Sequence, residues 1–305
     1  MSPALWVAAP VIGFIGMMSG GYWGIGCGWL VVPTMLIFGF EPMEAVGIGL
    51  LQMAPATLPT VLRQLPEIGW KQGEPGRMLA LPLAIGALPA SFAGKPINKL
   101  LLELSGSNRP LQYLLMAVIG VIAIQTLFGR TAGNTGEMPV ITRQKQRIAF
   151  VAGIATGLLS SLLGVGGGIL TRPLLSSFFR VPEYYTGRMV RFLLLITTVV
   201  GGLSYIIGAE IGGEIFLVAM AAAAGGMAGF PIGAAIHRIV LEAGYARHIH
   251  RSFAVVAVAL LTNTALNMAG CNELCRLLML FIGIGLALYL GIFCWYAAKH
   301  PRADI

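Results

Sequence analysis

The chain has 305 residues, of which 57% are hydrophobic and only 10% are charged. Roughly a quarter of the residues in soluble domains are charged, so this composition excludes an ordinary soluble protein. The net charge of +8 does not indicate a nucleic-acid partner, because lysine and arginine accumulate on the cytoplasmic loops of membrane proteins. Apolar runs long enough to cross a bilayer recur along the whole chain, and they predict an all-α polytopic membrane protein.

About eight to eleven hydrophobic segments are expected from the lengths of these runs. In chain order they cover residues 3–20, 29–40, 45–62, 78–102, 110–128, 148–163, 169–179, 189–208, 215–236, 252–270 and 277–298. The polar stretches between them, including 180–188 and 237–251, are expected to be loops. The four histidines fall in these loops or in the tail and are expected to be solvated: His237, His248, His250 and His300. No acidic residue is expected at mid-membrane.

One sequence in the second half contains four glycines between two apolar runs. It reads Gly164-Val-Gly-Gly-Gly and is followed after four residues by Pro173; its other glycines are Gly166, Gly167 and Gly168. Glycine runs end helices, and inside a bilayer the freed backbone groups are tolerated only where protein or water covers them. A helix that restarts after such a break directs free N–H groups at the gap and stabilises an anion there.

The first half carries a matching sequence 140 residues earlier. At this offset Gly24, Gly26, Gly28 and Pro33 align with Gly164, Gly166, Gly168 and Pro173, Gly47 aligns with Gly187, and Gly86 aligns with Gly226. The alignment predicts a first transmembrane repeat (1–129), a linker (130–147) and a second repeat with an extra C-terminal helix (148–305). Matched broken segments in two halves indicate a transporter binding site.

The distribution of basic residues predicts the orientation of the chain. With the linker in the cytoplasm, the outer side holds only four of the twenty lysines and arginines, namely Lys95, Lys99, Arg109 and Arg276. This bias favours an N-terminus outside the inner membrane and a cytoplasmic C-terminus. The two glycine-broken hairpins then enter from opposite sides, so the repeats are predicted to have inverted topology.

The paired motifs, GxGxG followed after four residues by proline, resemble those of the TauE/SafE family, also called the 4-toluene sulfonate uptake permease family. The resemblance covers the whole chain, although the first copy has Cys27 where the second has Gly167. It implies transport of small anions such as sulfite, sulfoacetate, other sulfonates and related carboxylates. The substrate and the direction of transport are left open by the resemblance.

Two arginines are the main candidates for binding an anion. Arg172 lies one turn beyond the glycines at apparent membrane depth, and its planar guanidinium suits a sulfonate or carboxylate. The alternative is an arginine whose head extends to the cytoplasmic surface. Arg191, nearer a predicted loop, is the second candidate. Neither has a basic counterpart in the first half, where Val32 and Leu51 align.

Polar residues on apolar segments complete the candidate site. Their hydroxyl and amide groups are able to bind an anion, or instead to bond within their own helix or between helices. The predicted substrate-binding set is Gly24, Gly26, Gly28, Gln52, Thr57, Ser160, Gly164, Gly166, Gly167, Gly168, Thr171, Arg172 and Arg191. Tyr22 and Trp23 are expected either to wall the first motif or to lie at the membrane interface.

These features predict a secondary transporter, with export favoured, that moves a small sulfur-containing anion by rocking one repeat against the other. The alternatives are a channel-like pathway, an importer of a small carboxylate, or a non-transporting membrane subunit. No enzyme activity, metal or cofactor is predicted. The coupling ion, H⁺ or Na⁺, is unassigned, as are a homodimer and a disulfide between Cys271 and Cys275. The expected partners are the anion and the lipid bilayer.

Overall fold

A computed structural model describes residues 3–107, 109–128, 140–208 and 211–300. All regular elements in these ranges are helical, as the sequence predicted. They are α1 (Pro3–Trp23), α2 (Gly28–Ile37), α3 (Pro42–Gln64), α4 (Leu81–Ser105), α5 (Arg109–Phe128), α6 (Arg143–Leu163), α7 (Gly168–Pro173), α8 (Glu183–Ile207), α9 (Gly213–Glu242), α10 (Ala246–Met268) and α11 (Asn272–Lys299), with short η1 (Leu65–Ile68), η2 (Gly76–Ala80) and η3 (Leu174–Phe178).

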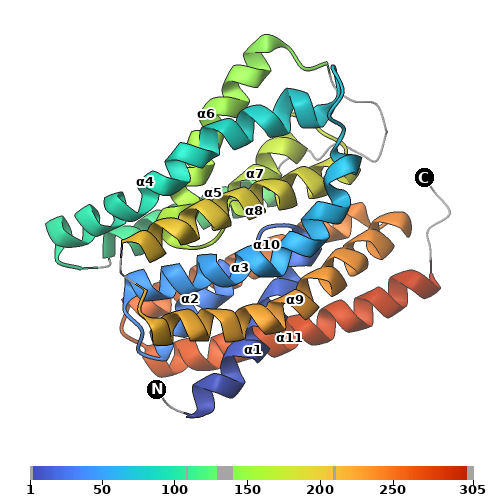
Figure 1. The fold of residues 1–305 in the computed structure, drawn as a ribbon. Coiled ribbons are helices and arrows are strands. Elements are labelled where there is room, and N and C mark those ends of the chain that lie inside the picture. The colour runs from blue at the N-terminus through green and yellow to red at the C-terminus, as the bar shows by residue number, and fades with distance from the viewer. Residues whose placement is uncertain (1–2, 108, 129–139, 209–210, 301–305) are drawn as a thin grey trace.

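Eight of the described helices are long and apolar enough to cross a membrane. Many large apolar side chains on their outer faces are exposed, as expected for surfaces that meet lipid rather than water. The prediction of an all-α polytopic membrane protein is therefore confirmed. The described helices form one bundle, with α4, α6 and α8 on one side of α3 and with α1, α9 and α11 on the other (Figure 1).

Both predicted helix breaks are present. In the first half α1 ends at Trp23 and α2 begins at Gly28; in the second half α6 ends at Leu163 and α7 begins at Gly168. The aligned glycines share one unusual conformation: φ is +76° at Gly24 and +85° at Gly26, and +67° at Gly164 and +78° at Gly166. Residues other than glycine rarely adopt these φ values, so the aligned glycines allow the same turn to form in both halves.

The two breaks contact each other through their backbones. A Cβ atom added to Gly28 would overlap the carbonyl oxygen of Gly164, and one added to Gly168 would overlap the carbonyl oxygen of Gly24. The contact is reciprocal at the 140-residue offset. Neither glycine accommodates a side chain without moving the opposite break.

The helices of the two halves interlock. α1 packs chiefly on α9, and the corresponding α6 packs chiefly on α4, so the first helix of each half pairs with the fourth helix of the other half. Gly225, Gly229 and Gly233 of α9 lie against the α1 backbone at Pro10, Phe14 and Met18, and this spacing of small residues allows the two helices to approach closely. The inverted topology of the repeats in a membrane stays a prediction.

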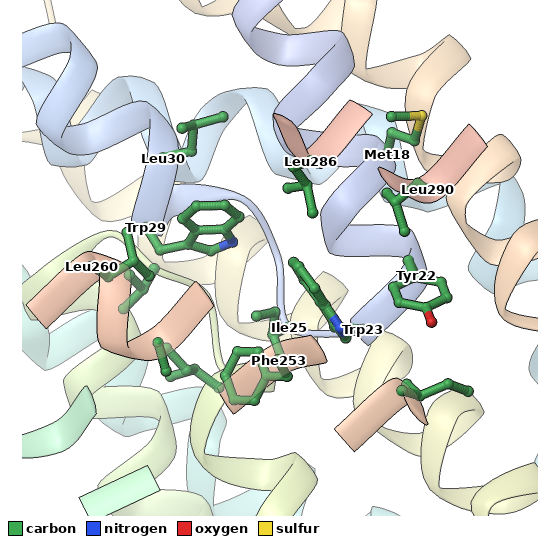
Figure 2. Packing of buried hydrophobic residues seen from close by; sticks show 14 of the residues in the cluster. Met18, Tyr22, Trp23, Ile25, Trp29, Leu30, Phe253, Leu260, Leu286 and Leu290 are labelled. Carbon is green, nitrogen blue, oxygen red and sulfur yellow. The ribbon is translucent and has the colours of Figure 1, made fainter. Parts of the chain in front are cut away.

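A buried aromatic cluster surrounds the first break (Figure 2). Trp23, at the end of α1, lies with its ring centroid 5.8 Å from that of Phe253 and 6.3 Å from that of Trp29. Tyr22 and Trp23 are fully buried, so they wall the first motif and do not face the outside of the bundle. These apolar side chains thereby pack against part of the break.

Two predicted loops are wrong. α8 begins at Glu183, inside the expected 180–188 loop, and α9 continues to Glu242, inside the expected 237–251 loop. His237 is consequently buried in a spanning helix, contrary to the expectation that it is solvated, and Glu183, expected in a loop, is a buried carboxylate at the start of α8. Most of the predicted linker lies outside the described residues, and the described cysteines, including Cys271 and Cys275, are free thiols.

The backbone contact between the two breaks predicts that Gly28→Ala lowers the free energy of unfolding by about 1–3 kcal/mol, because the new methyl group forces the two backbones apart. The matched control is Gly283→Ala in α11, where an added Cβ meets nothing within 4 Å and alanine favours the helix. The measurement is the apparent melting temperature of the detergent-purified protein. Equal melting temperatures for the two variants would contradict the backbone crossing.

Candidate functional site

The site is built around the C-terminal end of α1. A helix that ends inside a protein leaves its last carbonyl groups without intrahelical partners, and its dipole places partial negative charge there. Three successive carbonyls accept hydrogen bonds from side chains of other helices: Gly21 from Nη2 of Arg191 at 3.0 Å, Tyr22 from Nδ1 of His237 at 2.7 Å, and Trp23 from Nη1 of Arg172. The donors come from α8, α9 and α7.

Arg172 lies buried at the C-terminal end of α1. Its side chain is 3% exposed, so the guanidinium does not extend to the membrane surface. Nη1 bonds to Trp23, and Nη2 forms an ion pair with Oε1 of Glu183. Arg172 belongs to the second half and therefore caps the C-terminal end of α1 in the first half. Its positive charge is largely balanced by the carboxylate of Glu183.

Glu183 is a functional candidate that the sequence analysis missed. It occupies the first turn of α8 directly after Pro182, where an acidic residue commonly marks a solvated helix start. Here it is 4% exposed and also lies 3.8 Å from Nε2 of His237. The proline–glutamate pair signals the helix start, but only the approach of Arg172 from α7 and of His237 from α9 surrounds the carboxylate.

Arg191 is buried like Arg172 but is less completely bonded. Besides Gly21, its guanidinium donates to Oε1 of Gln64 at 3.2 Å, and its Nε has no partner among the described residues. An unpartnered donor at 3% exposure is costly unless water or a ligand satisfies it. Arg191 is thus the better placed of the two predicted arginines to bind an anion.

A polar cavity of about 360 Å³ reaches Arg191 and His237. Its walls come from α3, η1, α8 and α9, and the acidic residues Glu67 and Glu242 lie among four arginines. Arg188 forms an ion pair with Glu67 at 2.6 Å, which joins α8 to η1. The cationic lining residues are Arg63, Arg188, Arg191 and Arg238. The cavity has an excess of positive charge and suits a small anion.

The matching helix end in the second half has neutral partners. The carbonyl of Ser161 accepts from the hydroxyl of Tyr205 at 3.1 Å, and the carbonyl of Leu162 accepts from Nδ2 of Asn98 at 3.0 Å. These carbonyls align with those of Gly21 and Tyr22 at the 140-residue offset. In both halves the carbonyl groups at the helix end need hydrogen-bond donors. Of these two ends, only that of α1 has arginines as donors.

The predicted polar residues are divided between several environments. Thr57 and Thr171 donate to the carbonyls of Met53 and Gly167 in their own helices, the second of the two alternatives raised for them. Gln52 bridges helices by donating to Sγ of Cys27 in the first break. The Ser160 hydroxyl is buried with no partner among the described residues, and Thr197, not predicted, accepts from the Gly167 N–H at 3.1 Å.

The structure therefore brings together the glycines of both breaks with Gln52, and it brings Arg172 together with Arg191 at the end of α1. The two groups of residues are not one continuous cavity: of the predicted residues, only Arg191 lines the polar cavity described above. Among the described residues, no group of three histidine, cysteine or acidic side chains is arranged to hold a metal ion.

Comparison with known proteins identifies the family. A model of the family described as "Sulfite exporter TauE/SafE" matches residues 9–268, which include α1 through α10. "Probable membrane transporter protein YunE" of Bacillus subtilis is 24% identical over 75% of this chain and 87% of its own length. "Probable sulfite/organosulfonate exporter TauE" of Cupriavidus necator is 28% identical over 57% of this chain and 62% of its own length. No solved structure matches the chain.

The family match extends over both glycine-broken helices, the arginines at the end of α1 and the cavity beside them. Proteins of this family are membrane transporters rather than enzymes, in agreement with the sequence analysis, which predicted no enzyme activity. The chain belongs to the sulfite exporter TauE/SafE family.

Proposed function

We propose that this protein is a secondary transporter that exports a small sulfur-containing anion, such as sulfite, sulfoacetate or another organosulfonate. The family description and the printed name of the Cupriavidus necator relative support a sulfur oxyanion as substrate. A tetrahedral or pyramidal oxyanion presents several acceptor oxygens, which suit the fork of donors on a guanidinium. The arginine-lined cavity lies on the side of the bundle that the basic loops predict to be cytoplasmic.

The observation that carries the proposal is the position of Arg191. It is a buried cation that lines a polar cavity and has one donor, Nε, without a partner among the described residues. An anion that enters past Arg63, Arg188 and Arg238 would end its path at Arg191 and His237, below the end of α1. The surface arginines raise the local anion concentration, and Arg191 supplies the direct contact.

Arg172 has a different task in this proposal. Its guanidinium is already used by the Trp23 carbonyl and by Glu183, so it holds the end of α1 in place and orients the site. An arginine of this kind is a positioning residue. Its removal damages binding through the fold, whereas removal of Arg191 damages binding directly.

Alternating access in this protein would move two helix groups that are each built from both repeats. One group is α1, α2, α3 and α9, and the other is α4, α6, α7 and α8, because these helices pack most extensively within each group. Because α1 packs on α9 and α6 packs on α4, each repeat is joined to the other, and the two repeats do not move as separate bodies. The groups meet at α3 and α8, on either side of the crossed breaks.

A guanidinium also pairs with carboxylates, so the substrate class is tested with both kinds of anion. We expect sulfite, thiosulfate, taurine, isethionate or sulfoacetate to raise the melting temperature of the detergent-purified protein more than sulfate or simple carboxylates do. A larger shift with carboxylates would contradict the sulfur-anion assignment. No shift with any of these anions would contradict an anion site in the cavity.

Arg191→Gln is expected to weaken binding of the stabilising anion by about tenfold to a hundredfold, the effect of losing a charge-assisted hydrogen bond of about 1.5–3 kcal/mol. Arg109→Gln, an exposed arginine on the predicted outer side, is the control and should leave the dissociation constant unchanged. Isothermal titration calorimetry measures both. Equal affinities for the two variants would exclude Arg191 from the anion site.

The ion pair of Arg172 and Glu183 predicts a double-mutant effect. Arg172→Gln leaves a buried carboxylate without its main partner and should lower stability by about 3–5 kcal/mol. Glu183→Gln in the same chain removes that carboxylate and should restore most of the loss. Melting temperatures of the two single variants and the double variant measure the coupling, and additive losses would show that the pair does not interact.

A further inference from the structure

His237 faces two hydrogen-bond acceptors. Its Nδ1 lies 2.7 Å from the Tyr22 carbonyl oxygen, which only accepts, so Nδ1 carries a hydrogen. In the neutral imidazole, Nε2 then has a lone pair. This lone pair faces Oε1 of Glu183 at 3.8 Å, and both atoms are buried. A proton on Nε2 converts a contact between two acceptors into a charged donor–acceptor pair.

The combined charge of the polar cluster at the end of α1 suits two kinds of anion. This cluster consists of Arg172, Glu183, Arg191 and His237. Arg172, Arg191 and Glu183 together leave one positive charge when His237 is neutral, which matches a monoanion. When His237 is protonated, the cluster has two positive charges and matches a dianion. In a surrounding of low dielectric, this difference in charge matching is large enough to link the proton to the anion.

The imidazole has a path to solvent and a defined set of charged neighbours. His237 lines the polar cavity beside Arg191, so water in the cavity can deliver or remove the proton. The titratable and charged groups around it come from each neighbouring helix: Tyr22 on α1, Arg63 on α3, Glu67 in η1, Arg172 on α7, Glu183, Tyr184, Arg188 and Arg191 on α8, and Arg238 and Glu242 on α9.

We propose that His237 and Glu183 form a proton-binding site linked to the anion site, so that a dianion bound at Arg191 brings one proton onto Nε2 of His237. This inference rests on the proposed anion site. The proton comes from water in the cavity, is bound to Nε2 beside the Glu183 carboxylate, and returns to water when the anion leaves. No covalent bond to carbon, nitrogen or sulfur is made or broken. Anion and proton therefore cross the membrane together.

Two anions with the same sulfonate group separate the charge effect from the binding itself. Sulfoacetate carries a second negative charge on its carboxylate, whereas isethionate carries a neutral hydroxyl, and neither anion changes its charge near neutral pH. Calorimetric titration in two buffers with different ionisation enthalpies counts the protons taken up on binding. We expect about one proton for each sulfoacetate bound and a smaller fraction for isethionate.

His237→Asn is the main variant, because the asparagine amide can still donate to the Tyr22 carbonyl but cannot take up a proton. It should take up no proton with either anion, and its affinity should fall about tenfold more for sulfoacetate than for isethionate. Glu183→Gln, which keeps the shape of the side chain, should likewise abolish proton uptake. His300→Gln, at an exposed histidine after α11, is the control and should behave as the native protein.

The outcomes separate this proposal from the proposed function. Binding of both sulfonates with enthalpies that do not depend on the buffer would overturn the proton site and leave the anion site standing. Proton uptake that persists in His237→Asn would also overturn it. Absence of binding of either sulfonate to the native protein would remove the sulfonate site and, with it, the proton site.

Discussion

The carbonyl oxygens at the end of α1 must receive hydrogen bonds inside the membrane, and this requirement organises the site. Each unpaired backbone group in hydrocarbon costs several kcal/mol. Three donors from three helices of the second half meet the requirement: Arg172, Arg191 and His237. Because two of them are arginines, the cluster needs a negative charge, which Glu183 supplies in part and a bound anion would complete. In the proposed function, the same cations hold the end of α1 and form the anion site.

The matching end of α6 illustrates how one backbone arrangement supports two chemical environments. Its carbonyls are satisfied by Asn98 and Tyr205, which are neutral, so no excess charge is buried there. The break itself is the same in both halves, with glycines of positive φ at aligned positions. The backbone thus repeats, while the helices that pack against each break determine its electrostatics. The proposed anion site beside α1, without a counterpart beside α6, rests on this asymmetry.

The exchange of partners between the halves constrains the motion of the protein. α1 packs on α9 and α6 packs on α4, through glycines whose missing side chains allow the backbones to touch. Such close contacts resist sliding, so the proposed alternating access places the relative movement between the two mixed helix groups, at α3 and α8. The crossed breaks lie between these groups. A change in their separation would alter how the arginines on α7 and α8 reach the end of α1.

Composition and the length of the apolar runs were sufficient to determine an all-α membrane protein, because lipid leaves helices as the only spanning structure for such runs. The paired glycines located both breaks, since positive φ is a local property of the residue. The partners of Arg172 and Arg191, and the burial of Glu183 and His237, were decided only by the tertiary structure. Arg172, Arg191 and His237 lie about 150 to 215 residues from the carbonyls of α1 that they contact, and no local pattern specifies which distant helix packs against a helix end.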